Sequence, residues 1–162
     1  MKPQVITLTV NGRTQHAALA PNVTLLTALR DLGYIDVKCG CEKGDCGACA
    51  ILLDGVAVNS CLVLAWQAED AEIVTSAGLG NIENPHPLQL AFANEGAIQC
   101  GYCTPGLIIA TKALLDQNPH PDEAEIRDAI SGNLCRCTGY TQIIRAVQSV
   151  SSFGGMAKEG ER

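Results

Sequence analysis

Four cysteines in the first half of the chain have a spacing typical of metal-binding thiolates. Three of them form a C-x4-C-x2-C pattern and a fourth follows at a distance: Cys41, Cys46, Cys49 and Cys61. This is the plant-type spacing of a [2Fe–2S] cluster held by four thiolates. The nearby glycines allow a short loop to direct backbone N–H groups at anionic sulfurs, because they lack a Cβ: Gly40, Gly44 and Gly47. A zinc site and a disulfide pair are the alternatives, and three cysteines at this spacing in a glycine-rich loop favour the cluster over both.

Two further pairs of cysteines lie in the second half, each beside a predicted helix. They are Cys100 with Cys103, and Cys135 with Cys137. Helix N-termini offer free N–H groups and partial positive charge, so two such pairs suit the four corners of one anionic cluster. A redox dithiol lacks its usual βαβ context here, and a Rieske centre would need two histidines among the cysteines. Spacing alone leaves a cluster and a structural zinc ion equally open at this second site.

Composition and charge exclude several classes of protein. The net charge is -6 over 162 residues, so the chain lacks the basic surface that binds nucleic acid or anionic lipid. Residues 1–5 contain no apolar segment typical of a secretory signal. The longest apolar run, 106–115, is interrupted by Thr111 and Lys112 and is too short to cross a membrane. Nine cysteines fit eight ligands and a spare thiol. We therefore expect a cytoplasmic protein with no nucleic-acid partner and no membrane insertion.

The elements that position the first cysteines are predicted to form a small mixed sheet with one helix packed on it. Apolar residues alternate over 4–10, and Asn11-Gly12 predicts a hairpin turn into a return strand over 13–18. Leucines at helical spacing predict a helix from Leu25 to Leu32, with Gly33 after its end. Further strands are expected at 50–53, 56–58 and 72–75.

A Gly, Asn and Pro-rich stretch at 76–87 is interpreted as a linker, and every periodic segment after it is helical. Helices are expected at 87–95, from an N-cap at Thr104 to Asn118, from a capping box at Asp122 and Glu125, and around 143–150. The tail, 151–162, is small and polar and is predicted to fray.

Two longer motifs in this half resemble a known signature. The segments Gln99–Gly106 (QCGYCTPG) and Gly132–Tyr140 (GNLCRCTGY) are similar to the second-cluster signature of the molybdenum hydroxylases, the xanthine dehydrogenase family. The first cysteine loop is similar to the ferredoxin-like domain of the same small iron–sulfur subunit, so the resemblance covers about residues 4–150. It implies an α+β fold, with an N-terminal β-grasp ferredoxin-like domain at 1–78 and an all-α four-helix domain at 79–162.

The resemblance also implies roles for individual residues. The first [2Fe–2S] cluster would be held by Cys41, Cys46, Cys49 and Cys61, and the second by Cys100, Cys103, Cys135 and Cys137. Gln99 and Cys137 match positions that contact the pterin of the molybdenum cofactor. Cys39 departs from the family pattern and is interpreted as a spare buried thiol, with a redox-sensitive thiol and a rival ligand as alternatives; the spacing selects Cys41 as the ligand.

By the same resemblance, the chain is expected to act as an electron-transfer subunit without a substrate site of its own. Electrons would pass from a molybdopterin centre on a large subunit through both clusters to FAD on a medium subunit or to another acceptor. The complex would be a heterotrimer or its dimer, acting on a purine or another N-heterocycle. A carbon monoxide dehydrogenase or aldehyde oxidoreductase subunit is the alternative substrate class. A free ferredoxin carrier and a zinc-stabilised binding module are alternatives of another kind.

Overall fold

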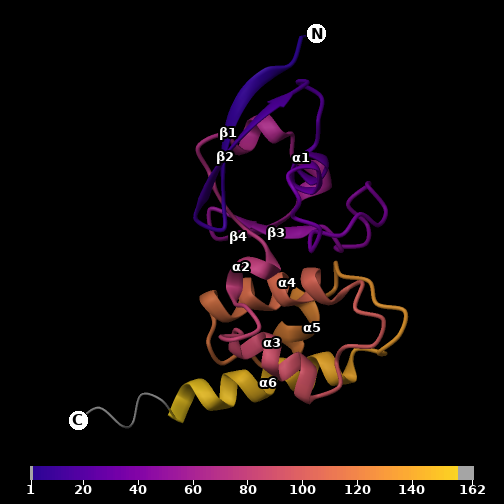
Figure 1. Cartoon of the computed structure of the whole chain (residues 1–162). Helices are drawn as coiled ribbons and strands as arrows, with labels where there is room; N and C mark the ends of the chain where they lie inside the picture. The colour runs from indigo at the N-terminus through magenta and orange to yellow at the C-terminus, as the bar shows by residue number, and fades with distance from the viewer. Residues whose placement is uncertain (1, 157–162) are drawn as a thin grey trace, which may run out of the picture.

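The computed structural model describes the backbone of residues 2–156 as a sheet-containing half followed by a helical half (Figure 1). The first half contains β1 (Gln4–Val10), β2 (Arg13–Leu19), α1 (Leu25–Asp31), β3 (Ala50–Leu53), β4 (Val56–Asn59) and β5 (Glu72–Val74), with 3-10 helices at Ser60–Leu62 and Ala65–Ala68. The second half contains α2 (Ser76–Leu79), α3 (Pro87–Asn94), α4 (Thr104–Gln117), α5 (Glu123–Ala129) and α6 (Thr141–Met156). The fold is therefore α+β, as the sequence predicted.

The five strands form one mixed sheet in the order β2-β1-β5-β3-β4. β1 and β2 pair antiparallel across the predicted turn, where Asn11 and Gly12 have φ of 52° and 72°, as a type I′ hairpin requires. β3 and β4 form the second antiparallel hairpin. β5 lies between the two hairpins, parallel to β1 and antiparallel to β3. The end of the first half of the chain therefore lies at the centre of the sheet.

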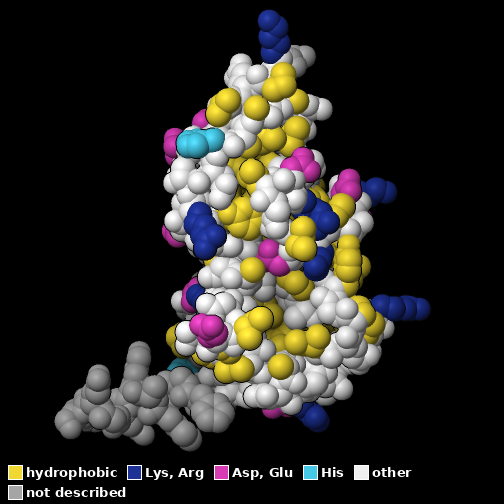
Figure 2. Space-filling view, viewed as in Figure 1, with side chains coloured by type: hydrophobic (Ala, Val, Ile, Leu, Met, Phe, Trp, Pro, Cys, Tyr) yellow, Lys and Arg dark blue, Asp and Glu magenta, His cyan; other side chains and the backbone are white. Residues whose placement is uncertain are grey.

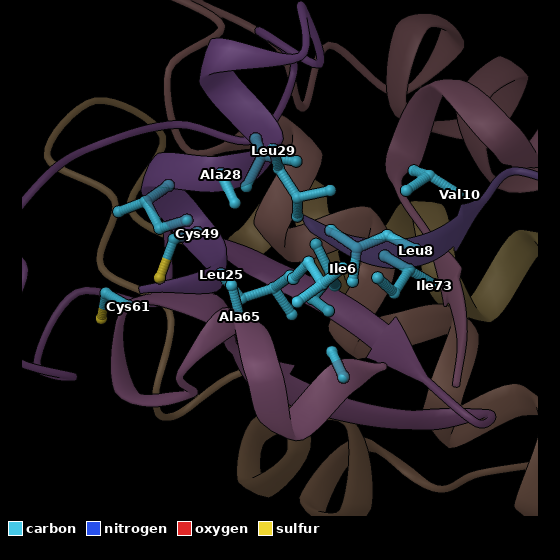
Figure 3. Packing of buried hydrophobic residues seen from close by; sticks show 14 residues of the cluster. Ile6, Leu8, Val10, Leu25, Ala28, Leu29, Cys49, Cys61, Ala65 and Ile73 are labelled. Carbon is cyan, nitrogen blue, oxygen red and sulfur yellow. The ribbon is translucent and has the colours of Figure 1, made fainter. Parts of the chain in front are cut away.

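The core of the first half lies between this sheet and α1. Fully buried Ile6 and Leu8 of β1 pack with Leu25 and Leu29 of α1 and with Ile73 of β5 (Figure 3). The segment between α1 and β3 therefore leaves the core at its edge, and Figure 1 shows it projecting from the side of the molecule. This segment carries the first three cysteines of the plant-type pattern.

The helices of the second half surround a separate core. Its fully buried side chains come from α3, α4, α5 and α6 and include Leu88, Phe92, Leu107, Ile126, Ile143 and Val147. The predicted capping box opens α5: the Glu125 N–H donates to Asp122 Oδ1, and the Asp122 N–H donates to Glu125 Oε2, both at 2.8 Å. The loops between α3 and α4 and between α5 and α6 carry the four cysteines of the second set.

Three predicted boundaries were wrong. The proposed linker begins with a short helix, α2, which is held from outside the segment because Gln89 Nε2 donates to the Ser76 carbonyl at 2.9 Å. Cys103, and not Thr104, is the N-cap of α4. In the tail that was expected to fray, α6 continues to Met156, while residues 157–162 lie outside the described residues.

The two halves are joined by direct packing. α4 lies against β3, where Ile109 and Ala113 of the helix bury Ala50 and Leu52 of the strand (Figure 1). This contact brings the N-terminal end of α4 towards the first cysteine loop. Within residues 2–156, none of the helices combines the length and apolar character needed to cross a membrane.

Candidate metal centres

The first four cysteines come together at the edge of the core of the first half. Cys41 and Cys46 are partly exposed in the loop before β3, whereas Cys49 and Cys61 are buried. Their thiols lie in two neighbouring pairs, Cys41 with Cys46 and Cys49 with Cys61. Figure 3 shows the sulfur atoms of the second pair at the margin of the packed side chains. Two pairs of thiols suit a [2Fe–2S] cluster, since each of its irons takes two cysteines.

Backbone hydrogen bonds and burial set the protonation of these thiols in opposite directions. The N–H groups of Lys43 and Asp45 donate to Cys41 Sγ at 3.4 and 3.3 Å. The Lys43 N–H makes the largest contribution to lowering the pKa of Cys41 to about 7. Burial, followed by the hydrogen bond with Cys49, raises the pKa of Cys61 to about 11. Metals bind thiolates, so the loop favours the metal-binding form of Cys41, whereas Cys61 would have to be deprotonated to bind a metal.

The backbone of the first loop is shaped around these sulfurs. A Cβ at Gly40 would lie 2.7 Å from Cys46 Sγ, so only glycine allows the chain to pass this close to the thiol. Gly47 has φ of 67°, and the non-glycine residue Glu42 is also left-handed, with φ of 55°. Strained backbone of this kind is typical of segments that wrap a ligand. The cradle therefore fits an anionic cluster.

The second set of cysteines comes from two loops that meet beside the first. Cys100 and Cys137 are exposed and neighbour each other, and Cys103 and Cys135 form a second, partly buried pair. All four border a cavity of about 210 Å³, whose wall is completed by residues of both halves: Gly40, Cys46, Ala48, Tyr102, Leu134 and Arg136. The paired arrangement again matches two irons with two thiolates each. The cavity also brings a first-site cysteine into the wall of the second site.

Hydrogen bonds at the second site separate the pKa values of the buried pair. Burial, followed by the hydrogen bond with Cys135, raises the pKa of Cys103 to about 12. Burial alone would also raise the pKa of Cys135, but hydrogen bonds from Thr138 lower it below its ordinary value. Thr138 donates from Oγ1 at 3.2 Å and from its N–H at 3.5 Å. Cys135 is therefore the thiol of this pair that loses its proton more easily.

Two residues that the sequence did not single out shape the second site. Tyr140 has φ of 70°, and its hydroxyl accepts from the Cys135 N–H at 2.8 Å while donating to the Asn133 carbonyl at 2.9 Å. Thr138 completes the turn by accepting from the Tyr140 N–H. Both lie within the Gly132–Tyr140 motif, which is the one sequence signal that could have indicated them.

A buried hydroxyl beside this site lacks a partner in the protein. Thr104 follows Cys103 in the chain and is 8% exposed, and its Oγ1 makes no hydrogen bond. Leaving such a group unsatisfied costs about 1–3 kcal/mol.

The remaining candidate residues lie outside the four pairs. The Cys39 thiol donates to Glu42 Oε1 at 2.7 Å, and this hydrogen bond raises its pKa. Gln99 is exposed and immediately precedes Cys100 in the chain. All nine cysteines are free of disulfides. Within the described range, no three His, Cys, Asp or Glu side chains converge on the position of a single metal ion.

Known proteins resemble both halves of the chain. A family model described as a 2Fe-2S iron-sulfur cluster binding domain matches residues 8–76, and one described as a [2Fe-2S] binding domain matches residues 75–148. The nicotinate dehydrogenase small FeS subunit of Eubacterium barkeri is 48% identical over 149 residues, which cover 91% of this chain and 95% of that protein. The xanthine dehydrogenase iron-sulfur-binding subunit of Escherichia coli O157:H7 is 46% identical over 147 residues, covering 88% and 91%. In the crystal structure of quinoline 2-oxidoreductase from Pseudomonas putida 86, a chain matches over the full length of both chains with a TM-score of 0.91 and 41% identity.

These matches address what spacing alone left open. Both halves match [2Fe–2S] domains, which favours an iron–sulfur site over a structural zinc site in the second half. The relatives that the chain matches over nearly their whole length are iron–sulfur subunits of oxidoreductases. The chain therefore belongs to the small [2Fe–2S] subunits of the molybdenum hydroxylase, or xanthine dehydrogenase, family.

Proposed function

We propose that this chain is the electron-transfer subunit of a molybdenum-cofactor hydroxylase. The observation that carries the proposal is the pairing of eight thiols into two adjacent four-thiol sites. Cys41, Cys46, Cys49 and Cys61 would hold the first cluster, and Cys100, Cys103, Cys135 and Cys137 the second. When bound, the clusters supply one-electron redox chemistry. Residues 1–78 would form a β-grasp ferredoxin-like domain, and residues 79–162 an all-α domain built on four helices, α3 to α6.

Hydrogen bonds connect the two cysteine sites and reach their sulfur atoms. The Leu134 N–H donates to the Cys46 carbonyl at 2.9 Å, so the backbone beside Cys135 contacts the backbone of a first-site cysteine. Backbone and hydroxyl donors stabilise negative charge on Cys41 and Cys135. Such hydrogen bonds to sulfur are among the factors that set the reduction potential of a cluster. Direct contact between the sites supports transfer of electrons from one to the other.

The exposed edge of the second site would face the subunit that carries the molybdenum cofactor. Cys100 and Cys137 are exposed there, and so are the large side chains of Tyr102 and Leu134, at 48% and 58%. Gln99 is exposed at the same edge, where its amide would hydrogen-bond the pterin. Figure 2 shows Lys and Arg side chains, together with Asp and Glu, along the side where the cysteine loops project in Figure 1.

Nicotinate, xanthine and quinoline, which are named in three of the matched proteins, all contain aromatic ring nitrogen and support an N-heterocycle as the substrate of the complex. Other matched proteins are aldehyde oxidoreductases at 40–42% identity, so an aldehyde is the alternative substrate class. The substrate would bind on the large subunit. Electrons would leave the first cluster for FAD on a medium subunit or for another acceptor, in a heterotrimer or its dimer within the cytoplasm.

The test compares the isolated chain with the complex. The isolated chain should contain iron and acid-labile sulfide and oxidise no N-heterocycle, and activity should appear only with the molybdenum subunit. In the complex, Gln99→Ala should keep both clusters and slow their reduction by substrate, because it removes one hydrogen bond of about 0.5–1.5 kcal/mol that orients the cofactor. Zinc in place of iron, or substrate oxidation by the chain alone, would contradict the proposal. An unchanged reduction rate with full cofactor content would remove the assigned role of Gln99.

A further inference from the structure

The two sites meet along a narrow seam, formed by Cys46 and Gly47 of the first loop and by residues 132–134 of the second. Two hydrogen bonds cross it. The Leu134 N–H donates to the Cys46 carbonyl at 2.9 Å, and Asn133 Nδ2 donates to the Gly47 carbonyl at 3.0 Å. The donors immediately precede Cys135 in the chain, and the acceptors belong to Cys46 and its neighbour. The seam therefore joins a ligand of one site to a ligand of the other.

Asn133 is fixed at the seam by its own half of the chain. It is only 6% exposed. Its N–H donates to the Ile130 carbonyl at 2.9 Å, and its carbonyl accepts from the Tyr140 hydroxyl, also at 2.9 Å. The backbone of Asn133 is thus held by the second half, and its side-chain amide reaches across to the first.

The seam leaves no space for rearrangement. A Cβ added to Gly47 would overlap the Gly132 carbonyl oxygen and the Asn133 amide, and Gly47 is left-handed, with φ of 67°. On the opposite side, a Cβ on Gly106 of α4 would overlap the Gly47 carbonyl oxygen. The Gly47 carbonyl is therefore confined between α4 and Asn133. A change in either neighbour must move the first loop relative to the second.

We propose that Asn133 is a positioning residue that sets the separation of the two clusters and, through it, the rate of electron exchange between them. The inference rests on the two clusters of the proposed function and deepens it. The exchange moves an electron from a reduced cluster to an oxidised one, and no bond forms or breaks at Asn133. Because electron tunnelling weakens steeply with distance, a small increase in the separation of the clusters lowers the rate of electron exchange between them.

The test uses the cluster-loaded chain with both clusters reduced. Their mutual magnetic interaction splits the electron paramagnetic resonance signals and depends on the distance between them. Asn133→Ala should retain both clusters by iron and sulfide content and lose this splitting. Hydrogen exchange of the Leu134 amide should become faster, because its bond to Cys46 is no longer supported. Gly106→Ala should produce the same loss from the other side, since alanine is a good helix former and its Cβ would overlap the Gly47 carbonyl oxygen and crowd Asn133 Nδ2.

Gln89→Ala is the matched control. Gln89 Nε2 also donates to a backbone carbonyl distant in the sequence, that of Ser76, at 2.9 Å, but neither residue lies in a cysteine loop. This variant should keep the splitting. If Asn133→Ala does not load both clusters, the splitting measured in Gly106→Ala alone tests the inference.

Unchanged splitting in Asn133→Ala or Gly106→Ala, with both clusters loaded, would overturn the inference. Loss of the second cluster from both variants would also overturn it, because Asn133 would then be needed for folding of that site. Failure of the proposed function is separate, because it would appear as missing clusters or missing partner-dependent activity in the unaltered chain.

Discussion

The Tyr140 hydroxyl offers a sharp test of how the second site is held together. It accepts from the Cys135 N–H and donates to the Asn133 carbonyl, at 2.8 and 2.9 Å. Tyr140→Phe removes both bonds and adds nothing, because the ring and its packing remain. The Asn133 carbonyl and the Cys135 N–H, on either side of Leu134, then lose the partner that they share.

The size of the effect follows from these two bonds. Each contributes about 0.5–1.5 kcal/mol net, so Tyr140→Phe should lower the stability of the loaded chain by about 1–3 kcal/mol. For a protein of this length, each kcal/mol corresponds to roughly 2–4 °C in the melting temperature. We therefore expect the melting temperature to fall by about 2–12 °C, with the second cluster released before the first.

The assay is thermal unfolding of the loaded chain, followed by circular dichroism and by visible absorbance of the clusters at one fixed heating rate. Tyr34→Phe is the control, since its hydroxyl accepts a single bond, from Gln15 Nε2 at 3.3 Å, far from the second site. If Tyr140→Phe and Tyr34→Phe melted alike and released their clusters in the same order as the unaltered chain, our account of Tyr140 would be refuted.

Three further predictions concern single residues. Cys39→Ser should keep both clusters and Cys41→Ser should lose the first, because the Cys39 thiol donates to Glu42 outside the thiol pairs; loss of iron from the Cys39 variant would reverse the ligand assignment. Thr104→Val should stabilise the iron-free chain by about 1–3 kcal/mol, since a buried hydroxyl without a partner is removed; a less stable iron-free variant in chemical denaturation would count against this. Burial, followed by the charge of Lys112, lowers the pKa of His86 below 6.5. Its stabilising contribution should therefore be complete above about pH 6.5 and be lost as the pH falls through the lowered pKa. His86→Asn, which keeps an N-cap acceptor, should flatten the melting temperature between pH 7 and pH 5, and an identical slope in both proteins would exclude His86 as the cause.

Elements whose signals are local were predicted well. The alternation over residues 4–10, the Asn11-Gly12 turn and the capping box at Asp122 all appear in the structure, because each depends on side chains within a few residues of one another. The cysteine spacing of the first loop is local in the same sense. The errors occurred where distant groups decide, as at α2, whose carbonyl at Ser76 is bonded by Gln89.

By itself, the sequence determined which residues can bind metal and that they form two sets, since cysteine identity, spacing and motif order are properties of the chain. Tertiary structure decided how the thiols pair and how the sets adjoin. Cys100 meets Cys137, and Asn133 reaches Gly47, only after two separate cores have formed and α4 has packed on β3. Periodicity cannot encode such contacts, because they depend on the relative placement of rigid elements and on a seam that excludes even a Cβ.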